Sequence, residues 1–380
     1  MRKNYIFTPG PVTVPPEVLA AGAMPVIHHR SPDFQPYFER MSENLKTVFA
    51  TKHPVVTFAS SGTGAFEAAL VGTASPGEKV LSLEGGKFGQ RWGLMAQAFG
   101  LNVTRYEHEW GTVPDVAWIA NFLKENPDTK AVYCSLCETS AGSLYPVKEI
   151  ASLTRDMETV LIVDAVSGLA ADELRTDEWG VDIAVTGSQK ALMCPPGLSF
   201  VSVNDKAQRA IEKSKTPQFY FSLKKALKSL KENTTPFTPA VNLIFSVDAA
   251  LKIIIEQGME DVWTRHARLA EGSRQAMLAI GCELFAQVPA NTVTTVKVPA
   301  DVDGGKIVKT LRERHGMIIM GGQDHLKGKI FRFATLGWSN EYDVVTIVGG
   351  IEQTLSELGH KFDKGAGVRA AQLYFDHNAA

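Results

Sequence analysis

The sequence predicts an α/β protein built around a mostly parallel sheet, and three observations support this prediction. Short apolar runs, several of them nearly unbroken and rich in Val and Ile, recur between residues 55 and 203, as in strands buried on both faces. Longer stretches with helical spacing separate these runs, and such alternation favours a sheet with helices on both sides. The chain has 380 residues, of which 44% are hydrophobic, enough for one large domain and a smaller companion.

The composition excludes several classes of protein. With 39 basic and 41 acidic residues the net charge is −2, and no dense basic run offers a footprint for nucleic acid. No stretch of apolar residues is long enough to span a membrane, and the N-terminus lacks the apolar segment of a signal peptide. Four cysteines are too few for a disulfide framework, so we expect a cytoplasmic protein. No pair of histidines has helical metal-ligand spacing, and we expect no metal site.

The first two thirds of the chain divide into an arm and a large domain. The Pro-rich segment 8–16 predicts an extended arm, which we assign to residues 1–20. Strands of the large domain, residues 21–260, are expected at the apolar runs Val55–Ala59, Val80–Leu83, Ala131–Leu136, Val160–Val163, Ile183–Val185 and Ser199–Val203. The Lys-rich residues 206–235 predict a solvated helix face followed by a loop. A long helix is expected from Pro239 to about Gly258, continuing past Trp263.

The remaining residues, 261–380, predict a small C-terminal α+β domain. Alternating polar and apolar residues over 292–298 indicate a strand, residues 305–315 a helix, and residues 330–333 a further strand. The Gly- and Ala-rich residues from Lys364 to Ala380 are expected to form a loosely held tail.

Three short motifs could carry chemistry. Ser60-Ser61-Gly62-Thr63-Gly64 follows a strand and precedes a helix, where backbone N–H groups suit a phosphate, although such a turn can also be structural. Asp164 ends a buried strand, where it could cap a helix or hold a protonated ring nitrogen. Lys190 follows another buried strand in a tight turn, and burial there would make its amine a nucleophile rather than a surface cation.

Taken together, these motifs match the needs of pyridoxal 5′-phosphate. The turn would anchor the phosphate, Asp164 would keep the pyridine nitrogen protonated, and Lys190 would bind the aldehyde as a Schiff base. Their order and spacing resemble the fold-type I pyridoxal-phosphate enzymes, and more closely the class V aminotransferases of the alanine/serine–glyoxylate branch. The resemblance extends over nearly the whole chain, through the segments Thr8-Pro9-Gly10-Pro11, Gly89-Gln90-Arg91, Glu138–Gly142, Gly187–Ala191, Pro195-Pro196-Gly197 and Phe331-Arg332.

The resemblance implies a role for each matching residue. It implies a fold-type I transferase with a seven-stranded sheet, Lys190 and Asp164 as catalytic residues, and Gly10 and Arg332 as substrate-binding residues, with Arg332 on the substrate carboxylate. The cofactor-binding residues that it implies, besides Lys190 and Asp164, are Ser61, Gly62, Thr63, Phe88, Thr139, Val166, Gln189 and Thr238. Phe88 would stack on the cofactor, usually a Trp in the family. Thr238 would bind the phosphate of the partner subunit in a homodimer with shared active sites.

The function expected from the resemblance is transfer of an amino group from alanine or serine to glyoxylate or another 2-oxo acid. Related enzymes use aspartate, 2-aminoethylphosphonate or ureidoglycine, and these donors remain open. A desulfurase would need a cysteine in a mobile loop, and Cys282 does not stand in one. Similar chains also carry the name of soluble-hydrogenase subunits, which leaves a non-catalytic partner as a rival. The roles of Thr235 and of His28-His29-Arg30 stay open, and Cys134 and Cys137 are expected to be buried structural thiols.

Overall fold

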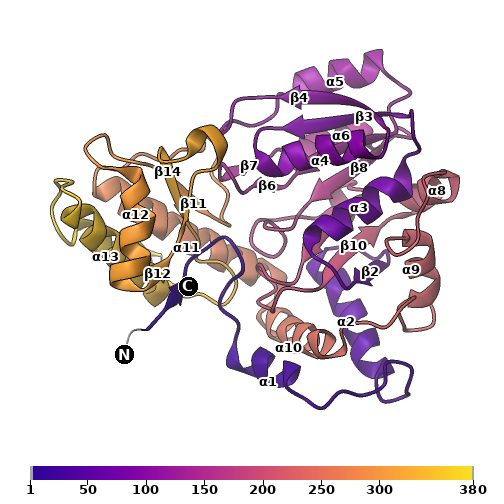
Figure 1. Cartoon of the computed structure of the whole chain (residues 1–380), viewed down its shortest axis with the longest axis horizontal. Helices are drawn as coiled ribbons and strands as arrows, with labels where there is room; N and C mark the ends of the chain where they lie inside the picture. Colours follow the sequence, from indigo (N-terminus) through magenta and orange to yellow (C-terminus); the bar gives the residue numbers. More distant parts are fainter. Residues whose placement is uncertain (1–2, 379–380) are drawn as a thin grey trace.

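The computed structural model describes residues 3–378 and contains a seven-stranded sheet in the order β2-β10-β9-β8-β5-β3-β4 (Figure 1). The strands are β2 (Val55–Phe58), β3 (Lys79–Glu84), β4 (Asn102–Glu107), β5 (Ala131–Ser135), β8 (Val160–Asp164), β9 (Ile183–Gly187) and β10 (Ser199–Val203). Only β10 runs against its neighbours, and it is antiparallel to both β9 and β2. The other six strands therefore point the same way, which confirms the expected mostly parallel sheet.

Six of these strands coincide with the apolar runs, and the sequence misses the seventh. Every residue of β2, β5, β8, β9 and β10 is buried, as continuous apolar runs require. β4 lies at the edge of the sheet and exposes Asn102, Thr104, Arg105 and Glu107. A polar edge strand gives no apolar run, and its charges protect the open edge.

Helices cover both faces of the sheet. One face packs against α3 (Gly62–Thr73), α4 (Lys87–Ala98), α8 (Asp205–Lys213) and α9 (Leu223–Leu230). The other packs against α2 (Gln35–Val48), α5 (Val116–Glu125), α6 (Val147–Thr154) and α10 (Val241–Gln257), with α1 (Pro16–Gly22) lying on α10. The Lys-rich segment thus forms two amphipathic helices. No helix between residues 3 and 378 is long and apolar enough to cross a membrane.

A second group of elements forms an α+β unit beside the sheet (Figure 1). Its antiparallel sheet contains β11 (Thr294–Lys297), β13 (Met320–Gly321) and β14 (Ile330–Phe333). Around it lie α11 (Met259–Ala279), α12 (Gly304–Thr310), the π-helical turn Leu311–His315, the 3₁₀ turn Asp324–Leu326 and α13 (Glu341–Glu357). β1 (Tyr5–Ile6) pairs in parallel with β12 (Met317–Ile318), and Phe7 packs in the core of this unit. The small α+β arrangement agrees with the expectation; the exact domain boundaries stay a prediction.

Three short elements complete the chain: β6 (Cys137–Glu138), β7 (Ser143–Leu144) and α7 (Thr176–Trp179). The prediction of a loosely held tail is wrong for most of its length, because α14 (Ala366–His377) packs along α11. Phe375 is buried against Gly272, whose Cβ, if present, would lie 2.4 Å from the ring. An Ala-rich segment is a good helix former, and this apolar contact holds it in place. Residues 379 and 380 lie outside the described part of the chain.

Candidate active site

The candidate residues gather at one edge of the large sheet because their strands are parallel. The segments that follow β2, β3, β5, β8 and β9 carry Ser61, Phe88, Thr139, Val166 and Lys190, respectively. Carboxyl ends of parallel strands meet at the same edge, which is where open α/β sheets bind ligands. This topology brings together residues that lie more than 120 positions apart.

Lys190 lies in the bend after β9 with its amine inside the protein. Its Nζ donates a hydrogen bond to the carbonyl oxygen of Pro9. Burial lowers the pKa of the amine to about 8, and the positive charges of Arg332 and Arg91 act in the same direction, against the opposing effect of Asp164. A substantial fraction of the amine is therefore neutral near physiological pH, as a nucleophile or a base requires.

Asp164, the last residue of β8, is a buried carboxylate. Its Oδ1 accepts a hydrogen bond from the backbone N–H of Val166 at 2.8 Å. Burial raises its pKa to about 7, although the hydrogen bond and the charges of Arg91 and Lys190 pull the value down. No helix begins here, since the next one along the chain is α7, so the carboxylate does not serve as a helix cap.

The predicted phosphate turn forms the start of α3. Ser61 is the N-cap residue, and its hydroxyl makes no capping bond. The N–H of Gly64 donates to the Ser61 carbonyl at 2.9 Å, which leaves the N–H groups of Gly62 and Thr63 for a ligand. Gly62 is buried against Val166, and a Cβ at Gly62 would lie 2.7 Å from Val166 Cγ2. The hydroxyl of Thr63 accepts from Arg91 at 3.0 Å.

The side-chain amide of Gln189 has an unpaired polar atom. Its side-chain oxygen is buried without a hydrogen-bond partner among residues 3–378. A half-turn of the side-chain amide would bring its N–H donor to the same place. An orphaned buried amide, free helix N–H groups and a nearby lysine fit an anionic cofactor that carries an aldehyde.

Phe88 and Thr139 lie on two segments that Glu138 ties together. The guanidinium of Arg91 lies 5.0 Å from the ring centroid of Phe88. The hydroxyls of Thr139 and Ser167 are 2.6 Å apart. The buried carboxylate of Glu138 accepts from the N–H groups of Phe88 and Gly89, the latter at 2.8 Å. It therefore fixes the start of α4, and with it Phe88.

Arg332 comes from β14 of the small unit and is 3% exposed. It donates to the carbonyl oxygens of Thr139 at 2.7 Å and of Gly321 at 2.8 and 3.1 Å. No carboxylate among the described residues lies within salt-bridge distance, so a surface salt bridge does not explain this arginine. Burial lowers the pKa of its guanidinium. A buried cation held only by carbonyls suits a substrate carboxylate.

Several candidates lie elsewhere. Thr238 lines a hollow with Phe58 and Leu198, and within residues 3–378 no hydrogen bond joins it to Lys190 of its own chain. The hydroxyl of Thr235 donates to the carbonyl of Phe237 at 2.6 Å. His28 and His29 have ring centroids 4.8 Å apart, and His28 Nδ1 accepts from the N–H of Arg30.

The four cysteines are free and buried, as expected for Cys134 and Cys137. Burial raises the pKa of the Cys282 thiol to about 12, which argues against a sulfur-accepting role. Within residues 3–378 no cluster of three metal-ligating side chains occurs.

Sequence reasoning gave no role to Arg91, Glu138 or Pro9, which contact the predicted site residues Thr63, Phe88 and Lys190, respectively. Arg91 and Glu138 stand inside motifs that carry the resemblance, and this was an available signal. A carboxylate within the buried run Cys134–Ala141 also needs a partner, which pointed to Glu138.

Comparison with known proteins is consistent with this site. The family model described as "Aminotransferase class-V" matches residues 5–333. The chain is 39% identical to a protein of Anabaena cylindrica named soluble hydrogenase 42 kDa subunit, over 99% of both chains. It is 35% identical to a serine–glyoxylate aminotransferase of Arabidopsis thaliana, over 99% of this chain and 96% of the relative. The crystal structure of ureidoglycine–glyoxylate aminotransferase from Bacillus subtilis matches with a TM-score of 0.93 and 28% identity, over 99% of both chains.

Proposed function

Since this chain belongs to the class V aminotransferases, fold-type I enzymes that depend on pyridoxal phosphate, we propose that it transfers an amino group from serine or alanine to glyoxylate. The observation that carries the proposal is the joint burial of Lys190, Asp164 and Arg332 around one edge of the sheet. The names of the serine–glyoxylate and ureidoglycine–glyoxylate relatives share the acceptor and differ in the donor. Glyoxylate as the acceptor is therefore better supported than serine or alanine as the donor.

Different residues would bind the phosphate and the ring of the cofactor. Ser61, Gly62, Thr63 and Gln189 would bind its phosphate with backbone and side-chain donors. Asp164 would pair with the pyridine nitrogen, and the proton shared there offsets the cost of a buried carboxylate. When bound, the cofactor supplies an electrophilic aldehyde and a sink for electrons.

Lys190 and Arg332 would act on the substrates. Arg332 binds the carboxylate that donor and acceptor have in common, and so orients both in turn. Lys190 Nζ takes the proton from the α-carbon of the donor and returns it during the transfer, which a pKa of about 8 allows. Because one site serves both substrates, the first product leaves before the acceptor binds, and ping-pong kinetics follow.

Three further features belong to the proposal. Phe88, Thr139 and Val166 would enclose the cofactor, and Gly10 would leave room for Lys190 and the substrate. Thr238 would reach the phosphate of a second subunit, which makes the enzyme a homodimer. The four free thiols support a reducing cytoplasm.

A panel of donors and acceptors tests the proposal. Serine, alanine, aspartate and ureidoglycine are each paired with glyoxylate, pyruvate and 2-oxoglutarate, and the amino acid formed is measured. We expect the highest kcat/KM for serine or alanine with glyoxylate. A clear preference for aspartate would assign another donor. No transfer with any pair would favour the non-catalytic role that the name of the Anabaena relative suggests.

A further inference from the structure

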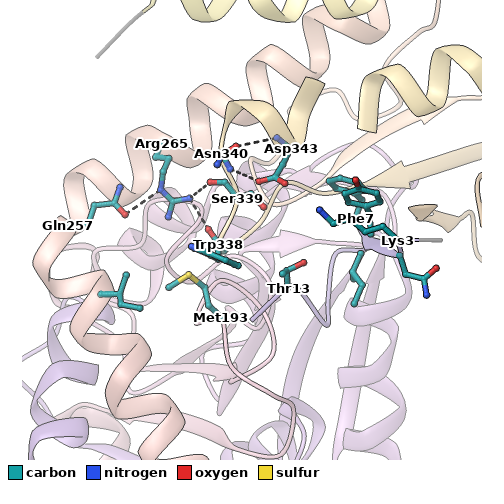
Figure 2. A pocket seen from close by; sticks show the side chains of 15 residues that line it. Lys3, Phe7, Thr13, Met193, Gln257, Arg265, Trp338, Ser339, Asn340 and Asp343 are labelled. Atoms are coloured by element: carbon teal, nitrogen blue, oxygen red, sulfur yellow. Dashed lines mark hydrogen bonds between the residues drawn. The ribbon is translucent and has the colours of Figure 1, made fainter. Parts of the chain in front are cut away.

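A second cavity of about 550 Å³ lies between β1 and the loop that joins β14 to α13 (Figure 2). Its walls come from β1 and the residues next to it, the segment after β9 that carries Lys190, α10, α11 and the connecting loop. They include Phe7, Met193, Ile253, Arg265 and Trp338. None of the residues predicted for the active site lines it. A cavity of this volume accommodates a small organic molecule.

Arg265 of α11 is the principal cation in this cavity. Its Nε donates to Gln257, and its Nη1 donates to the carbonyls of Gly337 at 2.8 Å and Ser339 at 3.1 Å (Figure 2). Nη2 has no acceptor among residues 3–378, and no carboxylate of these residues lies within 4 Å. Burial lowers the pKa of the guanidinium. A partly buried cation without a counter-ion is costly, and an anion bound beside it would relieve that cost.

The other charges leave the cavity weakly positive. Asp343 lines it, but its carboxylate accepts from the N–H of Asn340 at 2.9 Å at the start of α13, where the helix dipole already offsets its charge. Lys3 also lines it and lies over the ring of Tyr5 at 4.6 Å. With Arg265, the lining residues carry two positive charges and one negative.

Apolar side chains complete the walls. Phe7 and Met193 are buried, Ile253 is half-buried, and Trp338 is 46% exposed. A guanidinium with a free nitrogen beside an apolar wall suits a carboxylate head on an apolar body. We propose that this cavity is a second binding site, which takes a small organic carboxylate with an apolar body.

Gly337 and Met193 line the cavity and also lie beside the backbone of Lys190. Gly337 has φ +73°, and a Cβ there would lie 2.9 Å from Met193 Cγ and 3.4 Å from the carbonyl oxygen of Lys190. Gly337 is held from α11 on both sides, because its N–H donates to His266 at 3.0 Å and its carbonyl accepts from Arg265. Met193 in turn donates its N–H to the Lys190 carbonyl at 2.9 Å. A ligand on Arg265 would therefore bind beside residues that contact the backbone of Lys190.

Calorimetric titration of the holoenzyme with benzoate tests the proposal. The background is Arg332→Gln, which removes the carboxylate partner proposed for the active site. We expect one benzoate per chain, and at least tenfold weaker binding when Arg265→Gln is added. Arg209→Gln, an exposed arginine on α8, is the matched control and should leave the affinity unchanged. Because heat of binding is recorded rather than turnover, failure here is distinguishable from failure of the proposed function.

Two probes and one further variant sharpen the result. Benzamide, the neutral analogue, should bind at least tenfold more weakly than benzoate, and inorganic phosphate should not compete at equal concentration. Ile253→Trp places a larger side chain in the cavity from α10 and leaves Arg265 in place. It should block benzoate binding, and it tests the proposal if the Arg265→Gln variant does not fold. Binding that survives both variants, or equal binding of phosphate, would overturn the proposal.

Discussion

Gly10 lies directly against Lys190: a Cβ at position 10 would be 2.3 Å from Lys190 Cδ and 2.7 Å from its Nζ. The lysine side chain cannot move away easily, because its amine also donates a hydrogen bond to the carbonyl oxygen of Pro9. Gly10→Ala should therefore displace the lysine. We expect at least tenfold weaker retention of pyridoxal phosphate, measured by absorbance after gel filtration, in a protein that still folds.

Gly77→Ala is the matched control for this substitution. Gly77 also has a left-handed φ, of +83°, but a Cβ there meets nothing within 4 Å. The Gly77→Ala substitution should lower the free energy of unfolding by about 1 kcal/mol through backbone strain, and should leave cofactor retention unchanged. Equal retention by the two variants would show that the space at Gly10 is irrelevant to the lysine.

Asp164→Asn should stabilise the cofactor-free protein and weaken the loaded one. The pKa of Asp164 is about 7 when folded and 3.8 when unfolded, so the folded chain binds the extra proton between these values. Its contribution to stability is complete below pH 3.8 and is lost as pH rises through 7. The amide removes this loss, so the variant should gain stability over the parent from pH 4 to 8, up to a few kcal/mol at about 1.4 kcal/mol per pKa unit.

Thermal unfolding across that pH range measures the effect, and Asp172→Asn is the control. Asp172 is also buried, and burial raises its pKa to about 6, but its carboxylate accepts from the N–H of Asn291, which is not one of the predicted site residues. Asp172→Asn should flatten the same pH dependence without changing cofactor affinity. If Asp164→Asn bound the cofactor as tightly as the parent, the pairing of Asp164 with the ring nitrogen would be wrong.

Arg332→Gln should raise KM for both substrates by about 10- to 100-fold, because charge-assisted hydrogen bonds contribute about 1.5–3 kcal/mol. The specific readout is discrimination between alanine and alaninamide, which lacks the carboxylate. The parent should prefer alanine strongly, and the variant should treat both alike. Retained discrimination would assign the carboxylate to another residue.

Mixed dimers test whether Thr238 acts across the interface. Chains with Lys190→Ala are combined with chains that carry Thr238→Ala. If Thr238 binds the partner's phosphate, both lesions fall in one site and the other stays intact, so the hybrid should recover about half of the parent's activity. Hybrids as inactive as the two parental variants would place Thr238 in its own chain's site, and a fully active monomer would contradict shared sites altogether.

The sequence predicted best what depends on buried runs and strand order. Asp164 ends one apolar strand and Lys190 follows another, and parallel topology alone brings such residues to one edge. The sequence did not predict β4, because this exposed edge strand carries no apolar run. It did not predict α14, because the packing of Phe375 depends on Gly272, which lies about 100 residues earlier in the chain. Tertiary packing, not local pattern, decides both.

The rest of the site could not be predicted for a related reason. The link from Glu138 to Phe88 is a set of backbone hydrogen bonds that no spacing in the sequence announces. The second cavity draws on β1, α10, α11 and two loops, and Arg265 looks like any helical arginine until its missing counter-ion is seen. Three-dimensional contacts were needed for both.

The central claim is that Lys190 carries out amino transfer on a bound pyridoxal phosphate, and a single half-reaction tests it most directly. Holoenzyme is mixed with serine or alanine in the absence of any acceptor, and the visible absorbance of the lysine-bound cofactor is followed by stopped flow. The account predicts that this absorbance disappears in one turnover and returns when glyoxylate is added, and that Lys190→Ala, although folded and dimeric, shows neither the starting band nor the cycle. A Lys190→Ala protein that kept the band, or a parent whose absorbance no amino acid changed, would contradict it.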